Sequence, residues 1–349
     1  MAELAIYLAG VACVYYALLV GAVSGYRGKL FAVISIIAIG LVAVLRGAVG
    51  TDTANYEQMA GILRSPSDWY GVEPGFAVLV WFLGWFTDSD VVLVRLIAVM
   101  FVAGLLVFIR RADRDEMFFL TAYFIPAIFY QYSMNALRIG LATIFLLLAV
   151  QYFRRARVPQ AVLHVIAGWF FHYSLLISTI YLIASARLLS ARFVMSLSVA
   201  GLVFLGLVLF LFADYIVPRI LSYQGREPPS ALSGLSILIV LSVLLAGAMA
   251  SSMGRARRAG FVIITVVFVG GAFMLGRYTY AGLRVLDLLS IAVPASLLVL
   301  HGQEGRTLNW KTKLAFLFAG ALGLASSLRG FLLSAGEGET PWVPYEWIF

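Results

Sequence analysis

Four short groups of residues in this sequence could do chemistry, because each places charged or titratable side chains beside an apolar run. The first begins at Arg46 and passes through two glycines, which permit tight backbone turns, to Asp52. Arg46 could bind an anion, and Asp52 could accept a proton or orient a polar group. Asp52 or Thr53 could also start a short helix that continues through Met59.

The second group is Asn135-Ala136-Leu137-Arg138, at the start of the apolar run 137–154. Asn135 can cap the helix that this run predicts. Arg138 would then lie at a helix N-terminus, where the macrodipole disfavours a cation. A bound anion would remove this conflict, because the helix end and the guanidinium both attract it. We therefore expect Arg138 to contact an anion.

The third group, His172-Tyr173-Ser174, interrupts the apolar stretch 160–186. In a segment that lies inside a membrane, irregular backbone is tolerated where it is buried in protein or lines a water-filled cavity. An imidazole titrates near neutral pH, so His172 could accept a proton from a hydroxyl group. The alternative is a histidine that forms a hydrogen bond between helices.

The fourth group runs from Arg277 through Tyr278 and Tyr280 to Arg284 and Asp287. Arg284 and Asp287 are three residues apart, so they share one helix face and can form an ion pair. Tyrosines at a membrane interface are often only members of the aromatic belt. Two arginines beside a membrane-embedded aspartate favour a binding site, because charge at that depth is costly and usually functional.

The arginines in these groups indicate an anionic ligand. Its planar fork binds phosphate or carboxylate through two parallel hydrogen bonds. The alternative is that these arginines only reach toward lipid headgroups. We expect Arg138, Arg277 and Arg284 to converge on one cavity that binds an anion.

The elements that must position these groups are membrane helices. The chain has 349 residues, of which 62% are hydrophobic and 12% are charged, and its mean hydropathy is +0.98. A soluble domain has roughly 25% charged residues. A spanning helix needs about 20 apolar residues. We therefore predict an all-α polytopic membrane protein, a single membrane domain over 1–349 with about twelve crossing helices. Ten of the spans are predicted at 4–24, 29–46, 91–109, 117–133, 137–154, 193–213, 232–251, 256–276, 281–300 and 312–333.

Basic residues decide the predicted orientation. They cluster at Arg27/Lys29, Arg110/Arg111/Arg114, Arg154/Arg155/Arg157, Arg187/Arg192, Arg255/Arg257/Arg258 and Arg306/Lys311/Lys313. All of these clusters can face the cytoplasm under two conditions. Segment 160–186 must form a hairpin of two short helices that turns near His172 outside, and 74–86 must lie in the interface or re-enter. Both termini and the loops 47–73 and 214–231 are then outside. The net charge of +8 is explained by this bias, so nucleic acid is not an expected partner.

The sequence lacks the motifs of common cofactor and metal sites. The sequence has no Walker loop, Rossmann fingerprint, HExxH motif or cluster of metal ligands. We therefore expect no cofactor and no metal. Its lone cysteine, Cys13, lies in the first predicted span, so no disulfide framework is expected.

At these same groups the sequence resembles the EpsG-type branch of the Wzy polysaccharide polymerases. The resemblance covers most of the chain in order and spacing, and its specificity lies in the set of short motifs. The family often has glutamine directly after the arginine that corresponds to Arg138, and this chain has Ile139 at that position. The C-terminal half matches more loosely, through Arg277, Arg284 and Pro344-Tyr345. The motifs are Arg46…Gly50-Thr51-Asp52…Asn55-Tyr56, Glu73-Pro74-Gly75-Phe76, Asn135-Ala136-Leu137-Arg138-Ile139-Gly140-Leu141-Ala142 and Phe171-His172-Tyr173-Ser174-Leu175.

The resemblance implies polymerisation of lipid-linked glycan repeat units on the outer face of the bacterial cytoplasmic membrane. The donor would be an oligosaccharide on undecaprenyl pyrophosphate, and the acceptor a sugar hydroxyl of a second lipid-linked unit. The arginines would stabilise the pyrophosphate leaving group, and His172, favoured over Asp52, would be the base. The predicted substrate-binding residues are Arg46, Glu73, Arg138, Arg277, Tyr278, Tyr280, Arg284 and Asp287. Membrane lipid and a chain-length regulator are the expected partners.

Two other functions stay open. A transferase that adds a single sugar from a polyprenyl-phosphate donor would prefer a carboxylate base such as Asp52, together with a metal. A flippase or exporter of lipid-linked glycans would often show paired repeats with broken helices in corresponding halves, and no such pairing stands out here. Product length distinguishes the three functions, because only a polymerase extends the glycan repeatedly.

Overall fold

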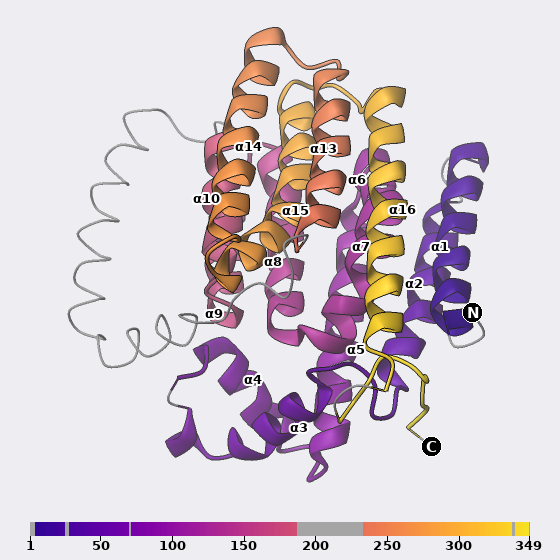
Figure 1. The fold of residues 1–349 in the computed structure, drawn as a ribbon, viewed down its shortest axis with the longest axis vertical. Coiled ribbons are helices and arrows are strands. Elements are labelled where there is room, and N and C mark those ends of the chain that lie inside the picture. The colour runs from indigo at the N-terminus through magenta and orange to yellow at the C-terminus, as the bar shows by residue number, and fades with distance from the viewer. Residues whose placement is uncertain (1–3, 25–27, 70, 187–232, 337–338, 349) are drawn as a thin grey trace, which may run out of the picture.

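Long apolar helices are the main elements of the fold (Figure 1). The computed structural model describes residues 4–24, 28–69, 71–186, 233–336 and 339–348. The elements are α1 (Ala5–Ser24), α2 (Gly28–Val44), α3 (Thr53–Ile62), η3 (Pro66–Asp68), α4 (Pro74–Leu83), α5 (Asp90–Arg111), α6 (Arg114–Phe119), η4 (Leu120–Phe124), α7 (Ile125–Tyr130), η5 (Gln131–Asn135), α8 (Leu137–Arg154), α9 (Val158–Phe171), α10 (Leu175–Ser185), α13 (Leu235–Met249), α14 (Arg255–Leu275), α15 (Tyr280–Gln303) and α16 (Trp310–Leu333).

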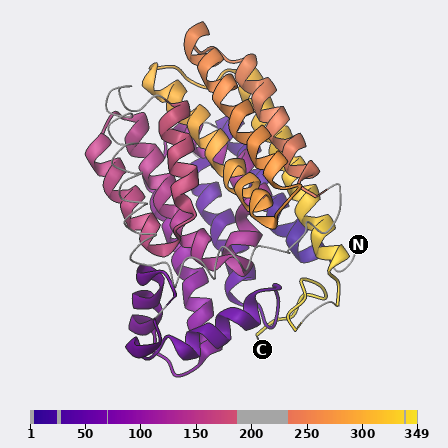
Figure 2. The same ribbon diagram turned by 60° about the vertical axis from the view of Figure 1, so that its left-hand side comes forward.

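The long helices run side by side, and their two ends differ (Figure 2). One end carries α3, α4, the loop 46–52 and the C-terminal segment 339–348, and is called here the α3–α4 end. The opposite end carries most of the described basic residues and is called the basic end. Its residues include Arg110, Arg154, Arg255 and Arg306. The sequence predicts that the α3–α4 end is outside.

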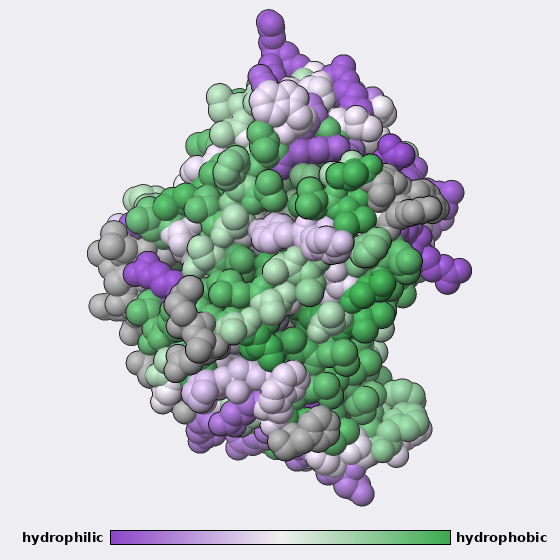
Figure 3. Space-filling model, turned by 90° about the vertical axis from the view of Figure 1, so that its right-hand side faces the viewer, coloured by the Kyte–Doolittle hydropathy of each residue, from purple (hydrophilic) through white to green (hydrophobic). Residues whose placement is uncertain are grey.

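The described residues form an all-α structure whose helices are suited to a membrane, as predicted. Six helices in the described part, α1, α5, α8, α14, α15 and α16, are long and apolar enough to cross a membrane. Shorter apolar helices accompany them: α2, α4, α9, α10 and α13. Apolar side chains form a broad band over the face in Figure 3, with hydrophilic residues mainly toward its two ends. The total of about twelve crossings stays a prediction, because the span 193–213 and the loop 214–231 lie outside the described residues.

The predicted span 117–133 is helical throughout, but it is not one regular α-helix. Helices α6 and α7 alternate there with the π-helical segments η4 and η5. A π turn inserts one residue into the helical repeat, so the side chains that follow it rotate to new faces. Such turns are rare and frequently lie at functional sites.

The hairpin over 160–186 is confirmed. Helices α9 and α10 flank His172, whose extended backbone (φ −161°, ψ 114°) ends α9. Gly168 lets the two helices approach, since a Cβ atom there would lie 2.5 Å from Leu175 Cδ2. His172 is therefore held at the tip of a tightly packed turn.

Two short helices occupy the α3–α4 end. Helix α3 begins after Asp52, as predicted, and ends at Ile62, three residues beyond the predicted end. Helix α4 has ten residues, so it is about 15 Å long, too short to cross a hydrocarbon core of about 30 Å. This length agrees with the prediction that 74–86 does not cross fully.

The C-terminal segment returns to the loop that follows α2. Arg46 and Trp347 form an antiparallel bridge, flanked by Gly47 N–H donating to Glu346 O at 2.8 Å. Thr340 Oγ1 donates to Gly50 O at 2.6 Å. This pairing was not predicted from the sequence. It fixes the loop 46–50 by hydrogen bonds at both of its ends.

Trp342 anchors this segment to the bundle, which makes its stability contribution testable. Its side chain is 4% exposed, and its ring stacks on Phe331 with centroids 4.0 Å apart. We expect Trp342→Ala to destabilise the protein by about 3–5 kcal/mol, seen as a lower unfolding temperature in detergent. Trp347→Ala is the matched control, because Trp347 is 50% exposed. Equal effects of the two substitutions would contradict an anchoring role of Trp342.

Candidate active site

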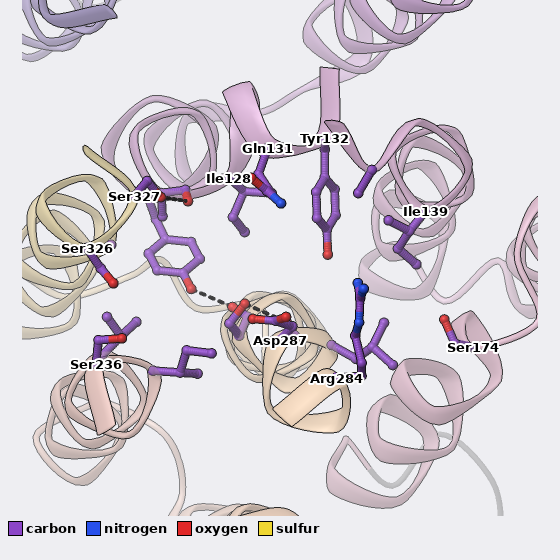
Figure 4. Close-up of a pocket in the computed structure, with 18 of the residues that line it drawn as sticks. Ile128, Gln131, Tyr132, Ile139, Ser174, Ser236, Arg284, Asp287, Ser326 and Ser327 are labelled. Carbon is purple, nitrogen blue, oxygen red and sulfur yellow. Dashed lines mark hydrogen bonds between the residues drawn. The ribbon is translucent and has the colours of Figure 1, made fainter. Parts of the chain in front are cut away.

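A cavity of about 270 Å³ lies within the bundle, nearer the α3–α4 end. Its walls come from η4, α7, η5, the start of α8, the α9–α10 turn, α13, α15 and α16, so segments far apart in sequence meet there (Figure 4). Polar side chains are numerous for this depth. They are Tyr123, Gln131, Tyr132, His172, Ser174, Ser236, Arg284, Asp287, Ser290, Ser326 and Ser327.

Arg284 and Asp287 supply charge to the cavity wall. They lie on one face of α15, as predicted, and both side chains are accessible although most of this helix is buried. The guanidinium carbon of Arg284 is 5.3 Å from the ring centroid of Tyr280. Figure 4 shows Tyr132 of η5 and Arg284 pointing toward each other across the cavity. An anion that enters here would meet a guanidinium and a phenol.

His172 belongs both to the cavity wall and to a charged cluster behind it. Its Nδ1 atom lies 2.8 Å from Glu73 Oε1, while Arg138 Nη1 donates to Glu73 Oε2 at 2.7 Å. The two oxygens of one buried carboxylate therefore join the α9–α10 turn to the start of α8. Tyr56 completes the cluster, because its hydroxyl accepts from the backbone N–H of Arg138 at 3.4 Å.

Glu73 determines which nitrogen of His172 carries the proton. Burial alone would raise the pKa of Glu73, but the hydrogen bond with His172 and the positive charge of Arg138 outweigh it and lower the pKa to about 2. Glu73 is then ionised at neutral pH and can only accept hydrogen bonds. His172 Nδ1 must therefore donate, and in the neutral ring Nε2 is left with its lone pair.

The position of Arg138 revises the prediction that it contacts a bound anion. It lies at the start of α8, where a cation is disfavoured. In the structure the carboxylate of Glu73 meets this charge, 65 residues away in sequence. Arg138 does not line the cavity and reaches it only through Glu73 and His172.

Arg46 is placed elsewhere. Its side chain is fully buried, and it donates to Ala43 O at 2.6 Å and to Met134 O at 2.9 Å. Met134 belongs to η5, whose end leaves carbonyl groups that the helix does not satisfy. The guanidinium of Arg46 therefore holds η5 in place and, contrary to expectation, is not part of the cavity wall.

Asp52 and Asn135 are also not among the residues that line the cavity. The prediction that Asn135 caps α8 is wrong, because the N-cap residue is Ala136. Asn135 Oδ1 instead accepts hydrogen bonds from the Asp52 backbone N–H at 2.7 Å and from Thr51 Oγ1 at 3.1 Å. Asn135 thus ties the loop before α3 to η5.

The predicted convergence of three arginines is only partly met. Arg284 lines the cavity, and Arg138 is linked to it through Glu73. Arg277 is exposed at the end of α14, with its guanidinium carbon 4.3 Å from the Phe273 ring centroid. Tyr278 and Tyr280 are not among the cavity residues either.

Sequence reasoning missed the hydroxyl and amide groups of the cavity. Gln131 and Tyr132 come from η5, and Tyr123 of η4 donates to Ser290 O at 2.5 Å. Serines of three further helices complete the wall. A signal was present in the polar run 131–135 and in the adjacent pair Ser326-Ser327 within an apolar helix.

The cavity wall holds one carboxylate, Asp287, and one imidazole, His172, among its described residues. No group of three or more histidine, cysteine, aspartate or glutamate side chains suited to a metal was found in the described parts of the chain. His172 is moreover hydrogen-bonded through Nδ1 to Glu73. The positive charge available to a ligand in the cavity therefore comes from Arg284.

The buried carboxylate of Glu73 predicts a pH-dependent stability. Its pKa is lowered from 4.5 to about 2. The contribution of the ionised carboxylate to the free energy of unfolding is therefore complete above pH 4.5 and is lost as the pH falls toward 2. This corresponds to about 3 kcal/mol at neutral pH. We expect Glu73→Gln to lower the unfolding temperature at pH 7, and the difference from wild type to shrink between pH 4.5 and pH 2. Asp68→Asn, at an exposed carboxylate, is the control. A difference that does not change with pH would contradict the ion cluster.

Nearly the whole chain resembles one known protein family. The model of the EpsG family matches residues 29–347, a range that contains every residue of the cavity and of the Glu73 cluster. Searches of curated proteins and of solved structures find no significant match. The family model covers far more than half of the sequence, and the chain therefore belongs to the EpsG family.

Proposed function

We propose that this protein polymerises lipid-linked glycan repeat units. It would transfer a growing glycan from undecaprenyl pyrophosphate to a sugar hydroxyl of another lipid-linked unit. Membership of the EpsG family supports a polysaccharide polymerase of the glycosyltransferase kind. The observation that carries the proposal is the cavity itself, whose wall combines Arg284 with His172, a histidine whose Nδ1 is bound by an ionised carboxylate.

The cavity is suited to the reacting part of the substrates only. Pockets for small molecules usually measure about 300–1,000 Å³, and this one measures about 270 Å³. The pyrophosphate of the donor would lie against Arg284, and the sugars beside it would meet the serines, Gln131 and Tyr132. The remaining sugars and the polyprenyl chain would extend out of the cavity.

The transfer is a displacement at the anomeric carbon of the donor. His172 Nε2 accepts the proton of the acceptor hydroxyl, and the hydroxyl oxygen forms the new bond to the anomeric carbon. The bond from that carbon to the pyrophosphate oxygen breaks, and its electron pair stays on the leaving group. Arg284 stabilises the charge that develops there. Glu73 holds the imidazole through Nδ1 and stabilises its protonated form.

We further propose that the α3–α4 end faces outward in the bacterial cytoplasmic membrane. Every described lysine lies toward the basic end. Most of the described arginines that lie outside α3, α4 and the cavity are also found there. Cytoplasmic loops carry such an excess. The cavity would then open in the outer half of the membrane, where flipped lipid-linked units are available.

Incubation of purified protein with synthetic lipid-linked repeat units, with and without chelator, tests the proposal. A ladder of products that differ by one repeat unit is expected in both conditions. Addition of a single sugar would instead indicate the single-sugar transferase. Unchanged glycans that move across a vesicle membrane would indicate a flippase.

A further inference from the structure

A second cavity lies at the basic end, away from the proposed active site. Its volume is about 670 Å³, and it is called here the groove. It lies between helices α1 and α2, called the α1–α2 hairpin, on one side and α6, η4 and the start of α16 on the other. The wall is mainly apolar and is formed by small residues of the hairpin and larger ones of α6. The residues concerned are Ala17, Leu18, Ala22, Ala32, Met117 and Phe118.

Three cations from three different helices also line this groove: Lys29, Arg114 and Lys313. Lys29 is the second residue of α2, Arg114 the first of α6 and Lys313 the fourth of α16, so all three lie at the same end of the groove. The lining carboxylate is Asp113, and Arg154 already donates to it at 2.8 Å. The groove therefore has one apolar part and one cationic end.

The hydrogen bonds of the cations leave this charge largely uncompensated. Lys29 Nζ donates to two backbone carbonyls, Arg110 O at 2.9 Å and Ala112 O at 3.4 Å. Lys313 Nζ lies 3.7 Å from Asp115 Oδ1, a long ion pair with the lysine side chain 37% exposed. Basic pockets between membrane helices are suited to anionic headgroups.

We propose that this groove binds one anionic phospholipid, with its phosphate against Lys29, Arg114 and Lys313 and an acyl chain along the α1 wall. A free phosphate ion would leave the apolar wall uncovered, and a zwitterionic lipid would oppose its own ammonium to the three cations. The bound lipid connects the α1–α2 hairpin to α6 and α16. The inference is independent of the proposed polymerase reaction.

Native mass spectrometry of the full chain in detergent tests the proposal. Phosphatidylglycerol and phosphatidylcholine with identical acyl chains are titrated separately. We expect the first phosphatidylglycerol to bind roughly tenfold to a hundredfold more tightly, because each basic residue near the headgroup contributes about 1 kcal/mol. Excess glycerol 3-phosphate should not displace it, since that compound lacks the acyl chains. Equal affinities of the two lipids, or displacement by glycerol 3-phosphate, would overturn the proposal.

Variants locate the site. The double variant Lys29→Gln/Lys313→Gln should bind phosphatidylglycerol about as weakly as phosphatidylcholine, whereas Lys311→Gln should behave as wild type. Lys311 is the matched control, because it lies two residues from Lys313 but beside the Trp310 ring and not in the groove. Should the double variant fail to fold, Arg114→Gln at an exposed helix start gives the same comparison. Retention of wild-type lipid preference by these variants would place the lipid elsewhere.

Discussion

Replacing His172 with alanine should lower the polymerisation rate about a hundred- to ten-thousandfold, the usual contribution of a positioned general base. The acceptor hydroxyl has a pKa far above neutral, so its proton must leave as the new bond forms. His172 lines the cavity, and its bond to the ionised Glu73 leaves Nε2 as the basic atom. Binding of the lipid-linked donor should change little, because Arg284 makes the proposed contact with the pyrophosphate.

The hairpin itself offers a matched control. His164 also belongs to α9, and its Nδ1 lies 2.7 Å from Gln160 O, but it does not line the cavity. His164→Ala should therefore retain nearly normal rates. Asp52→Asn should be affected mildly, because Asp52 does not line the cavity but its backbone is bonded to Asn135. Rates are measured as repeat units added per minute under saturating lipid-linked donor. Near-normal activity of His172→Ala together with an inactive Asp52→Asn would reverse the roles of the two residues.

The sequence predicts the helices well because membrane burial is decided locally. A run of apolar residues between charges must cross or line the bilayer, whatever it later packs against. The bounds of α1, α8 and α16 therefore follow closely from hydropathy. The turn at His172 is equally local, because a polar break divides an apolar stretch that is too long for one ordinary helix.

The partners within the site could not be predicted in the same way. Glu73 is 65 residues from Arg138 and 99 residues from His172, and hydropathy carries no information on which distant carboxylate meets which cation. The charge of Arg138 correctly indicated that a negative group must lie near the start of α8. Whether that group belonged to the protein or to a ligand depended on the packing of α4 against α9.

The π-helical segments explain why Gln131 and Tyr132 were not predicted to line the cavity. A regular helix over 117–133 would point Gln131 and Tyr132 in directions set by the period of 3.6 residues. The π turns η4 and η5 shift that register, and tertiary contacts such as the bonds from Arg46 to the carbonyls of Ser133 and Met134 hold one of them in place. Arg46 was thus singled out correctly as unusual, but its partners are backbone oxygens.

Replacing Arg284 with lysine should have an effect of comparable size, for a different reason. The leaving pyrophosphate gains charge as its bond to the anomeric carbon breaks, and removing one donor aimed at such charge typically costs about a hundred- to a thousandfold in rate. Lysine keeps the positive charge, but its ammonium group is a compact point charge. It cannot form the two parallel hydrogen bonds that a guanidinium offers to phosphate oxygens.

The geometry predicts a graded series among the arginines. Arg284 lines the cavity and should be the most sensitive to lysine. Arg138→Lys should be intermediate, because it weakens the hold on Glu73 and hence the orientation of His172. Arg277→Lys should be nearly silent, since Arg277 is exposed beside Phe273.

Single-turnover rates, measured with the donor already bound, separate the chemical step from donor binding in this series. Arg329→Lys is the control for changes in detergent behaviour, because Arg329 is exposed late in α16. In Arg284→Lys the chemical step should slow more than donor binding weakens, because the lost interaction is strongest once the leaving group is charged. Normal single-turnover rates in this variant would mean that Arg284 only balances the charge of the cavity. The pyrophosphate would then have to be bound elsewhere.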